Sequence, residues 1–238
     1  QEHDISGLDV SAAGDVNGDG TQDILIGTPG TEVNGQNSGT AYLFHGPLYG
    51  TFSVSAADAR IDGDLLDNFG YFLCGVGDAD GDDYDDIVVG ALYADGGGTD
   101  SGEAYVFYGP LAGSLSSSAA DARLIGEEPS DHVARVAAAG DVNGDGLADI
   151  LAAAPAHNGG ASQRGAAYLV YGPVYGDLDL VYADAEIQGE DSTDRAGGVH
   201  CVGDVDDDGI DDFVMTDYRN DDGGNNAGKV YLFYGQGM

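Results

Sequence analysis

The chain has 238 residues, of which 43 are acidic and only 7 are basic, so its formal net charge at pH 7 is −36. Nucleic acids and anionic membrane surfaces bind cationic patches, so this balance excludes them as expected partners and favours a cation as ligand, a saline environment, or both. The hydrophobic content of 42% suffices for a packed core, and no apolar run approaches the ~20 residues of a membrane span.

In chain order, the first repeat predicts four short strands separated by turns. The segments are "LDVSAAG" from Leu8, "ILIG" from Ile24, "AYLFHG" from Ala41 and "ADARIDG" from Ala57. An acidic loop separates the first two, a Gly/Asn-rich loop the next two, and a Gly-Pro turn the last two. Such runs are rich in residues typical of strands, and none shows a sustained helical period, so the fold class predicted is all-β.

The same order of elements returns at a constant interval of 63 residues. The acidic loops begin at Asp15, Asp78, Asp141 and Asp204. A four-stranded antiparallel unit repeated at fixed length is typical of a β-propeller blade. We therefore predict a single propeller domain or propeller segment, 1–238, with four blades of four antiparallel strands. Their approximate bounds are 1–63, 64–126, 127–189 and 190–238.

The last repeat ends before its outer strand, so fifteen strands are predicted where four blades need sixteen. An open arc would expose blade faces and an unpaired edge, which favours self-association. Three arrangements stay open: a segment of a larger propeller, a two-chain ring, and a self-closed unit of four blades.

Each acidic loop places oxygen ligands at alternate positions. Carboxylates at about 4 Å repel each other by about 4 kcal/mol per pair at an effective dielectric constant of about 20, and a bound cation reverses that repulsion. Side chains at loop positions 1, 3, 5 and 9 and the carbonyl of position 7 suit Ca²⁺. The predicted ligands are Asp15, Asn17, Asp19, Thr21 (carbonyl) and Asp23; Asp78, Asp80, Asp82, Tyr84 (carbonyl) and Asp86; Asp141, Asn143, Asp145, Leu147 (carbonyl) and Asp149; and Asp204, Asp206, Asp208, Ile210 (carbonyl) and Asp212.

We therefore predict about four Ca²⁺ ions with a structural role, each tying one hairpin. An EF-hand is excluded because position 12 is a strand residue instead of glutamate. Position 6 is glycine except for Asp83, which aspartate tolerates in a left-handed conformation, so the second loop is expected to bind somewhat differently. The competing interpretation, plain Asp/Gly turns on an acidic surface, accounts poorly for four loops in fixed register.

The remaining reactive residues form no catalytic set, so no enzymatic activity is predicted. Cys74 and Cys201 fall on neighbouring positions of the 63-residue repeat, so their side chains are expected on opposite faces of a strand. We expect both to be small packed residues without a disulfide. The variable loops after the second strands lie at the end opposite the acidic hairpins, where binding residues gather on rigid scaffolds. The side chains there with recognition potential are Tyr93, His157, Arg164, Tyr218 and Arg219.

The order of small strand, "GDxNGDGxxD" loop and apolar burst resembles the FG-GAP repeat, which forms the blades of the α-integrin propeller and occurs in many bacterial surface proteins. The FG pair is kept at Phe69-Gly70, and its expected equivalents are Ser6-Gly7, His132-Val133 and Arg195-Ala196. The GAP element is approximated at 27–29, 90–92 and 153–155 and lost at 216–218.

This resemblance implies an extracellular or cell-surface recognition or adhesion module that contacts protein or glycan ligands on the face opposite the calcium loops. Two alternatives are a structural subunit of a surface assembly or filament, and a carbohydrate-active hydrolase or lyase on the same scaffold. The expected partners include neither nucleic acid nor membrane.

Overall fold

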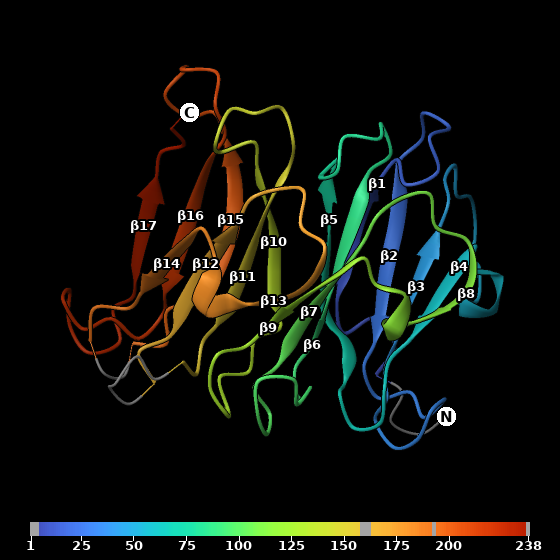
Figure 1. Ribbon diagram of the computed structural model, residues 1–238, viewed down its shortest axis with the longest axis horizontal. Helices are drawn as coiled ribbons and strands as arrows, with labels where there is room; N and C mark the ends of the chain where they lie inside the picture. Colours follow the sequence, from blue (N-terminus) through green and yellow to red (C-terminus); the bar gives the residue numbers. More distant parts are fainter. Residues whose placement is uncertain (1–4, 158–162, 192–193, 237–238) are drawn as a thin grey trace.

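A computed structural model describes residues 5–157, 163–191 and 194–236. These residues form seventeen strands and three short 3-10 turns, so the all-β prediction is confirmed. The strands make four sheets that stand in one row, with the first and the fourth sheet at opposite ends (Figure 1). No helix in the described part of the chain is long and apolar enough to cross a membrane.

The first sheet contains β1 (Val10–Gly14), β2 (Asp23–Thr28), β3 (Thr40–Phe44), β4 (Ala59–Asp62) and β8 (Gly113–Ser116). The second contains β5 (Phe69–Gly77), β6 (Asp86–Ala91), β7 (Glu103–Phe107), β9 (Ala122–Ile125) and β13 (Gly176–Asp179). The third contains β10 (Arg135–Gly140), β11 (Asp149–Ala154), β12 (Ala166–Val170) and β14 (Ala185–Gln188). The fourth contains β15 (Gly198–Gly203), β16 (Asp212–Asp217) and β17 (Lys229–Phe233).

The short apolar runs that follow the acidic loops, such as "ILIG" from Ile24, lie in the second strand of each sheet, which is an inner strand. β6, β7, β11 and β12 are buried along their whole length because a neighbouring sheet covers each face. Three apolar cores result, one in each space between successive sheets. This explains why the runs lack the alternation of a sheet with one solvated face.

Small residues let the first strands approach one another. A Cβ added to Gly75 in β5 would lie 2.4 Å from the carbonyl oxygen of Ala13 in β1. Gly90 of the second strand β6 likewise leaves room for the next sheet, since a Cβ there would lie 2.1 Å from the carbonyl oxygen of Ala134, just before β10. β1, β5, β10 and β15 consequently line one common cavity of about 430 Å³. Cys74 and Cys201 both face it as free thiols.

Two strands, β8 and β13, were not predicted. β8 pairs in parallel with β4, the outer strand of the first sheet, and β13 pairs in parallel with β9 of the second sheet. The second and the third repeat therefore each add a short strand to the sheet of the preceding repeat. The expectation of purely antiparallel four-stranded units is wrong for these two sheets, because four residues such as "GSLS" carry no strand pattern of their own.

The FG pair has different equivalents from those expected from a constant interval. The backbone of Phe69, Val133 and Ala196 packs against Gly39, Gly102 and Gly165 in turn. Val133-Ala134 and Ala196-Gly197 therefore correspond to Phe69-Gly70, one residue later than predicted. The second repeat differs because β5 carries an irregularity in its pairing with β6 between Phe69 and Leu73.

Candidate functional site

The four acidic hairpins lie at one end of the molecule, each between the first and second strand of its sheet. They occupy residues 15–22, 78–85, 141–148 and 204–211, along the upper edge in Figure 1. The strands before each hairpin end in a register shift, for example between Cys201 and Gly203 in β15. All four hairpins thus leave their sheets through the same backbone irregularity.

The first carboxylate of each hairpin holds the turn. Asp15 accepts hydrogen bonds from the amides of Asp19 at 2.9 Å and Gly20 at 2.7 Å. Asp78 likewise accepts from the amides of residues 81–83 at 2.6–3.1 Å. The chain turns at position 6 with a positive φ, which is 85° at Gly20 and 70° at Asp83. Asp83 thus adopts the left-handed conformation that the sequence required of it.

The aspartate at position 9 is buried in every hairpin, at Asp23, Asp86, Asp149 and Asp212. Asp86 accepts one hydrogen bond from the amide of Ala79 at 2.7 Å and another from the amide of Gly109 at 2.8 Å. One oxygen thereby fixes the hairpin and the other fixes the Gly-Pro turn after the third strand. Burial raises the pKa of Asp86 to about 7 and that of Asp149 to about 6, because desolvation penalises the charged form.

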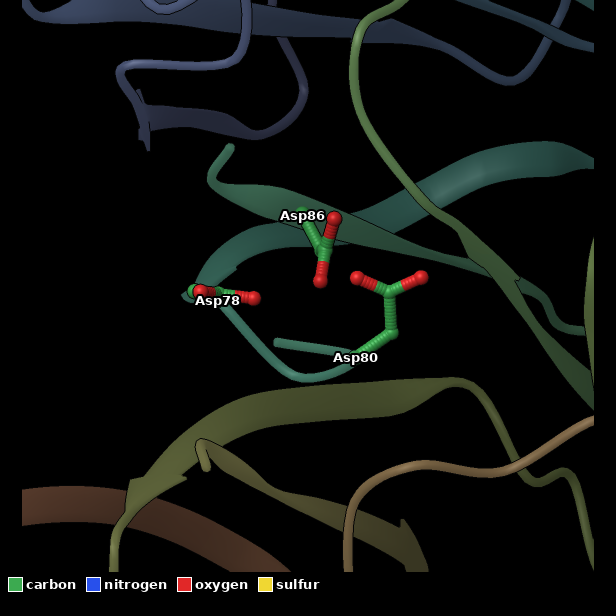
Figure 2. Close-up of side chains that lie close together, drawn as sticks. All are labelled: Asp78, Asp80 and Asp86. Atoms are coloured by element: carbon green, nitrogen blue, oxygen red, sulfur yellow. The ribbon is translucent and has the colours of Figure 1, made fainter. Parts of the chain in front are cut away.

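Two hairpins bring three carboxylates together. In the second hairpin, oxygens of Asp78, Asp80 and Asp86 lie within 4.8 Å of one another. Figure 2 shows the three side chains directed toward a common point. Oδ1 of Asp80 is buried there without a hydrogen-bond partner in the described structure. An all-oxygen set with an unsatisfied buried oxygen fits a hard divalent cation, so this cluster could hold a metal ion.

The fourth hairpin groups Asp204, Asp206 and Asp212 in the same way, and this cluster could also hold a metal ion. In the first and third hairpins position 3 is Asn17 or Asn143, so no set of three carboxylates forms there among the residues described. Instead, Oδ1 of Asn17 accepts a hydrogen bond from the backbone amide of Asp19 at 2.9 Å, and Nδ2 of Asn17 donates one to Oδ2 of Asp19 at 3.2 Å. The amide oxygen of each asparagine remains the predicted neutral ligand.

Position 5 is placed alike in all hairpins. Its carboxylate accepts the amide of position 7 at 2.9–3.0 Å, in the pairs Asp19–Thr21, Asp82–Tyr84, Asp145–Leu147 and Asp208–Ile210. The predicted ligands therefore lie on tight turns of one common design.

One contact at this end was missed in the sequence. Asp85 of the second hairpin accepts the amide of Asp15 at 2.6 Å, and Asp211 of the fourth accepts that of Asp141 at 3.1 Å. These bonds connect the hairpins of successive sheets. Position 8 is acidic only in these two loops, but a lone acidic position gave no signal in an already acidic chain.

The opposite end contains a cavity of about 240 Å³. Its lining includes Tyr71, Phe72, His132, Arg135, Arg195 and Tyr218. Among the predicted recognition residues, Tyr218 lines it, Arg219 lies 5.6 Å from the Tyr218 ring, and Tyr93 packs edge-on at 5.6 Å against His132. The sequence missed Arg135 and Arg195 because both lie near strand starts instead of in the variable loops.

His157 and Arg164 are less available than predicted. His157 is 2% exposed, with Nδ1 3.0 Å from Asp131 and Nε2 3.6 Å from Glu186. The recognition potential expected of His157 is not supported by this geometry, since its ring is committed to a buried polar cluster. Arg164 is half-buried, and its Nε has no hydrogen-bond partner in the described part of the chain.

Burial lowers the pKa of His157, but the hydrogen bond and charge of Asp131 and the charges of Glu127 and Glu186 outweigh it. The pKa of His157 is consequently raised above its usual value. In the fourth repeat, Asn220 and Asp194 are the equivalents of His157 and Asp131. Nδ2 of the neutral Asn220 donates a hydrogen bond to Asp194 at 3.3 Å.

Sequence comparisons agree with this geometry. The family profile of the FG-GAP repeat matches residues 7–44, 69–107 and 133–170. A phosphatidylinositol-glycan-specific phospholipase D of Rattus norvegicus is 31% identical over 193 residues, which cover 76% of this chain and 23% of that protein. Integrin alpha-PS2 of Drosophila melanogaster is 36% identical over 94 residues, covering 37% of this chain and 7% of that protein.

Integrin alpha-X of Homo sapiens is 42% identical over 89 residues, covering 36% of this chain and 7% of that protein. The chain thus spans less than a quarter of the length of these relatives. The matched repeats begin at the first strand of a sheet and end at the third, which is the unit that carries the acidic hairpin. The chain is therefore an FG-GAP repeat protein, related in sequence to the α subunits of integrins.

Proposed function

We propose that this protein is a calcium-binding β-propeller module, extracellular or at the cell surface, that recognises protein or glycan ligands without catalysing a reaction. The observation that carries the proposal is the opposition of two ends: carboxylate hairpins at one, and a cavity lined by aromatic and arginine side chains at the other. Kinship with integrin α subunits supports the adhesive role.

In the second hairpin, Asp78, Asp80, Asp82 and Asp86 with the Tyr84 carbonyl would hold the ion, and the other hairpins would use the equivalent residues. Ca²⁺ fits six to eight oxygen ligands in flexible geometry. The bound ion supplies positive charge where carboxylates otherwise repel. The chain's part is to fix the turn through Asp78 and to anchor the hairpin to the sheet through Asp86.

The four sheets are proposed as blades of a propeller, and the outer face of the fourth sheet supports continuation by a further sheet. Val202, Val205, Val230 and Leu232 are 41–66% exposed on that face. In each of the three earlier repeats, the next sheet covers the equivalent residues, which are at most 5% exposed. In the first repeat these residues are Ala13, Val16, Ala41 and Leu43. In the proposed propeller a further sheet covers this face. That sheet belongs either to a larger ring of which this chain is a segment, or to a second chain that shares the ring.

Binding to protein and glycan arrays in the presence of Ca²⁺ and of a chelator tests the recognition function. We expect at least one ligand bound in Ca²⁺, with loss of binding as the chelator loosens the hairpins. Absence of any ligand on both arrays for the folded, Ca²⁺-loaded protein would overturn the proposal.

A structural subunit of a surface assembly is the second candidate, because the exposed apolar face favours association. Filaments visible by electron microscopy at micromolar protein concentration would support it. The phospholipase activity in the name of one relative is not transferred, since the chain covers 23% of that protein.

A further inference from the structure

The basic residues of this chain fall into two groups. Arg60, Arg123 and Lys229 each contact a carboxylate at 2.8, 2.6 and 2.7 Å. The other four arginines form no ion pair with a carboxylate in the described ranges, although the chain carries 43 acidic residues. In such an excess of carboxylates, unpaired guanidinium groups indicate positions from which acidic side chains are kept away.

Two of these unpaired arginines line the same small cavity. Arg135 opens β10 and lies 4.9 Å from the centre of the Phe72 ring, and Arg195 precedes β15 with its Nε 3.0 Å from Gln163. The partners are an aromatic ring and a neutral amide, so neither guanidinium charge is compensated by a carboxylate among the residues that the structure describes. Arg219, a third unpaired arginine, stands beside the Tyr218 ring that also lines the cavity.

The cavity wall combines these charges with flat apolar surfaces. Tyr71, Phe72 and Tyr218 contribute aromatic rings, and His132 contributes an imidazole. No acidic residue is among the described residues that line it. A guanidinium group binds a carboxylate through two parallel hydrogen bonds, and an aromatic face packs against the apolar face of a ring.

The size of the cavity and the net charge of the chain restrict the class of ligand that the cavity can bind. A volume of about 240 Å³ lies below the usual ~300–1,000 Å³ of sites for drug-sized ligands, so the cavity holds one ring-sized group. The net charge of −36 repels long polyanions, so a single carboxylate is favoured over a polymer of them.

We infer that this cavity binds one carboxylate-bearing sugar at the end of a glycan, with Arg135 and Arg195 on the carboxylate and the rings of Phe72 and Tyr218 against the sugar. The inference rests on the proposed recognition function and names the ligand class of its binding face. The cavity lies at the end opposite the acidic hairpins, so its walls and the proposed metal ligands are separate sets of residues.

The test is calorimetric titration of the whole Ca²⁺-loaded chain with glucuronate, with glucose as the uncharged analogue and acetate as the carboxylate alone. We expect glucuronate to bind at least about tenfold more tightly than either, since a hydrogen bond to a charged group and ring packing both contribute. Equal binding of glucuronate and glucose would overturn the inference. Equal binding of glucuronate and acetate would reduce the cavity to a plain anion site, which also overturns it.

Variants locate the binding. Arg135→Gln and Arg195→Gln are each expected to weaken glucuronate about tenfold, whereas Arg60→Gln, on β4 and away from the cavity, leaves it unchanged. Tyr218→Ala is expected to weaken glucuronate and not acetate. Melting temperatures of all four variants show whether each is folded, and unaltered binding by folded Arg135→Gln and Arg195→Gln would reject the site.

The array result separates this inference from the proposed function. A protein or neutral-glycan ligand whose binding survives Arg135→Gln and Arg195→Gln leaves the recognition function standing and rejects the acidic-sugar site. A short peptide with an aspartate side chain that binds more tightly than glucuronate assigns the arginines to a protein ligand and rejects the sugar.

Discussion

The carboxylate of Asp85 accepts a hydrogen bond from the backbone amide of Asp15, 2.6 Å away and 70 residues earlier in the chain. In return, the amide of Asp85 donates to the carbonyl of Asp15 at 3.2 Å. The first acidic hairpin is thereby attached to the second sheet. The position equivalent to Asp85 is Gln22 in the first repeat and Ala148 in the third, so only two of the hairpins carry this link.

Asp85→Ala should destabilise the protein by about 1.5–3 kcal/mol, the usual contribution of a hydrogen bond to a charged group. That corresponds to a decrease in melting temperature of several degrees for a chain of this size. Urea or thermal unfolding in Ca²⁺ measures it. Gln22→Ala, at the equivalent exposed position, serves as control and should change little; equal effects of the two variants would show that the link contributes nothing.

Removal of Ca²⁺ by a chelator should lower the melting temperature by many degrees. Ligand at about 100 times its dissociation constant contributes about 2.7 kcal/mol for one site, and about four sites are proposed. Differential scanning calorimetry with Ca²⁺ and with chelator gives the shift. An unchanged melting temperature would contradict metal binding by the hairpins.

Asp204→Asn and Asp207→Asn make the same chemical change in one hairpin, at position 1 and position 4. Asp204 belongs to the carboxylate cluster, whereas Asp207 is exposed with φ 63° and is outside it. In Ca²⁺, Asp204→Asn should lower the melting temperature and Asp207→Asn should not. With chelator the loss should be clearly smaller, because removal of one charge relieves repulsion within the cluster, and only the hydrogen bonds that Asp204 accepts from the amides of Asp208 and Gly209 are then affected. Identical behaviour of the two variants would argue against a metal site in this hairpin.

The pair of His157 and Asp131 predicts a pH dependence of stability. Since the pKa of folded His157 is raised above its unfolded value, its charged form stabilises the fold fully below about pH 6.5. That contribution is lost as pH rises through the folded pKa. His157→Asn, which imitates the pair Asn220–Asp194, keeps a hydrogen bond without the charge.

The difference in unfolding free energy between the original chain and His157→Asn should therefore be largest at low pH and shrink toward pH 8. Urea unfolding across this range measures it. His200→Asn, at an exposed strand position, is the control. A difference that stays constant with pH would mean that His157 is neutral in the folded protein.

The outer face of the fourth sheet should drive association. Val230→Lys with Leu232→Lys places charge at positions that are 66% and 42% exposed. Sedimentation velocity should show concentration-dependent association of the original chain and a monomer for the double variant. Tyr182→Lys, at an exposed site on a 3-10 turn outside this face, is the control. A monomeric original chain at all concentrations would contradict the prediction.

The sequence by itself determined the features that arise within one repeat. Alternating strands and turns, the interval of 63 residues and the positions of the acidic hairpins with their predicted ligands depend on neighbouring residues and on a pattern that occurs four times. The left-handed turn at Asp83 could be predicted for the same reason, because local backbone geometry limits position 6.

Only the tertiary structure decided what depends on contacts between repeats. The pairing of β8 with β4, the shift of the FG equivalents to Val133-Ala134, and the link from Asp85 to Asp15 all join residues far apart in the chain. Burial of His157 and the meeting of Arg135 with Arg195 have the same origin. Short segments have no pattern strong enough to encode such contacts, so packing of one sheet against the next selects them.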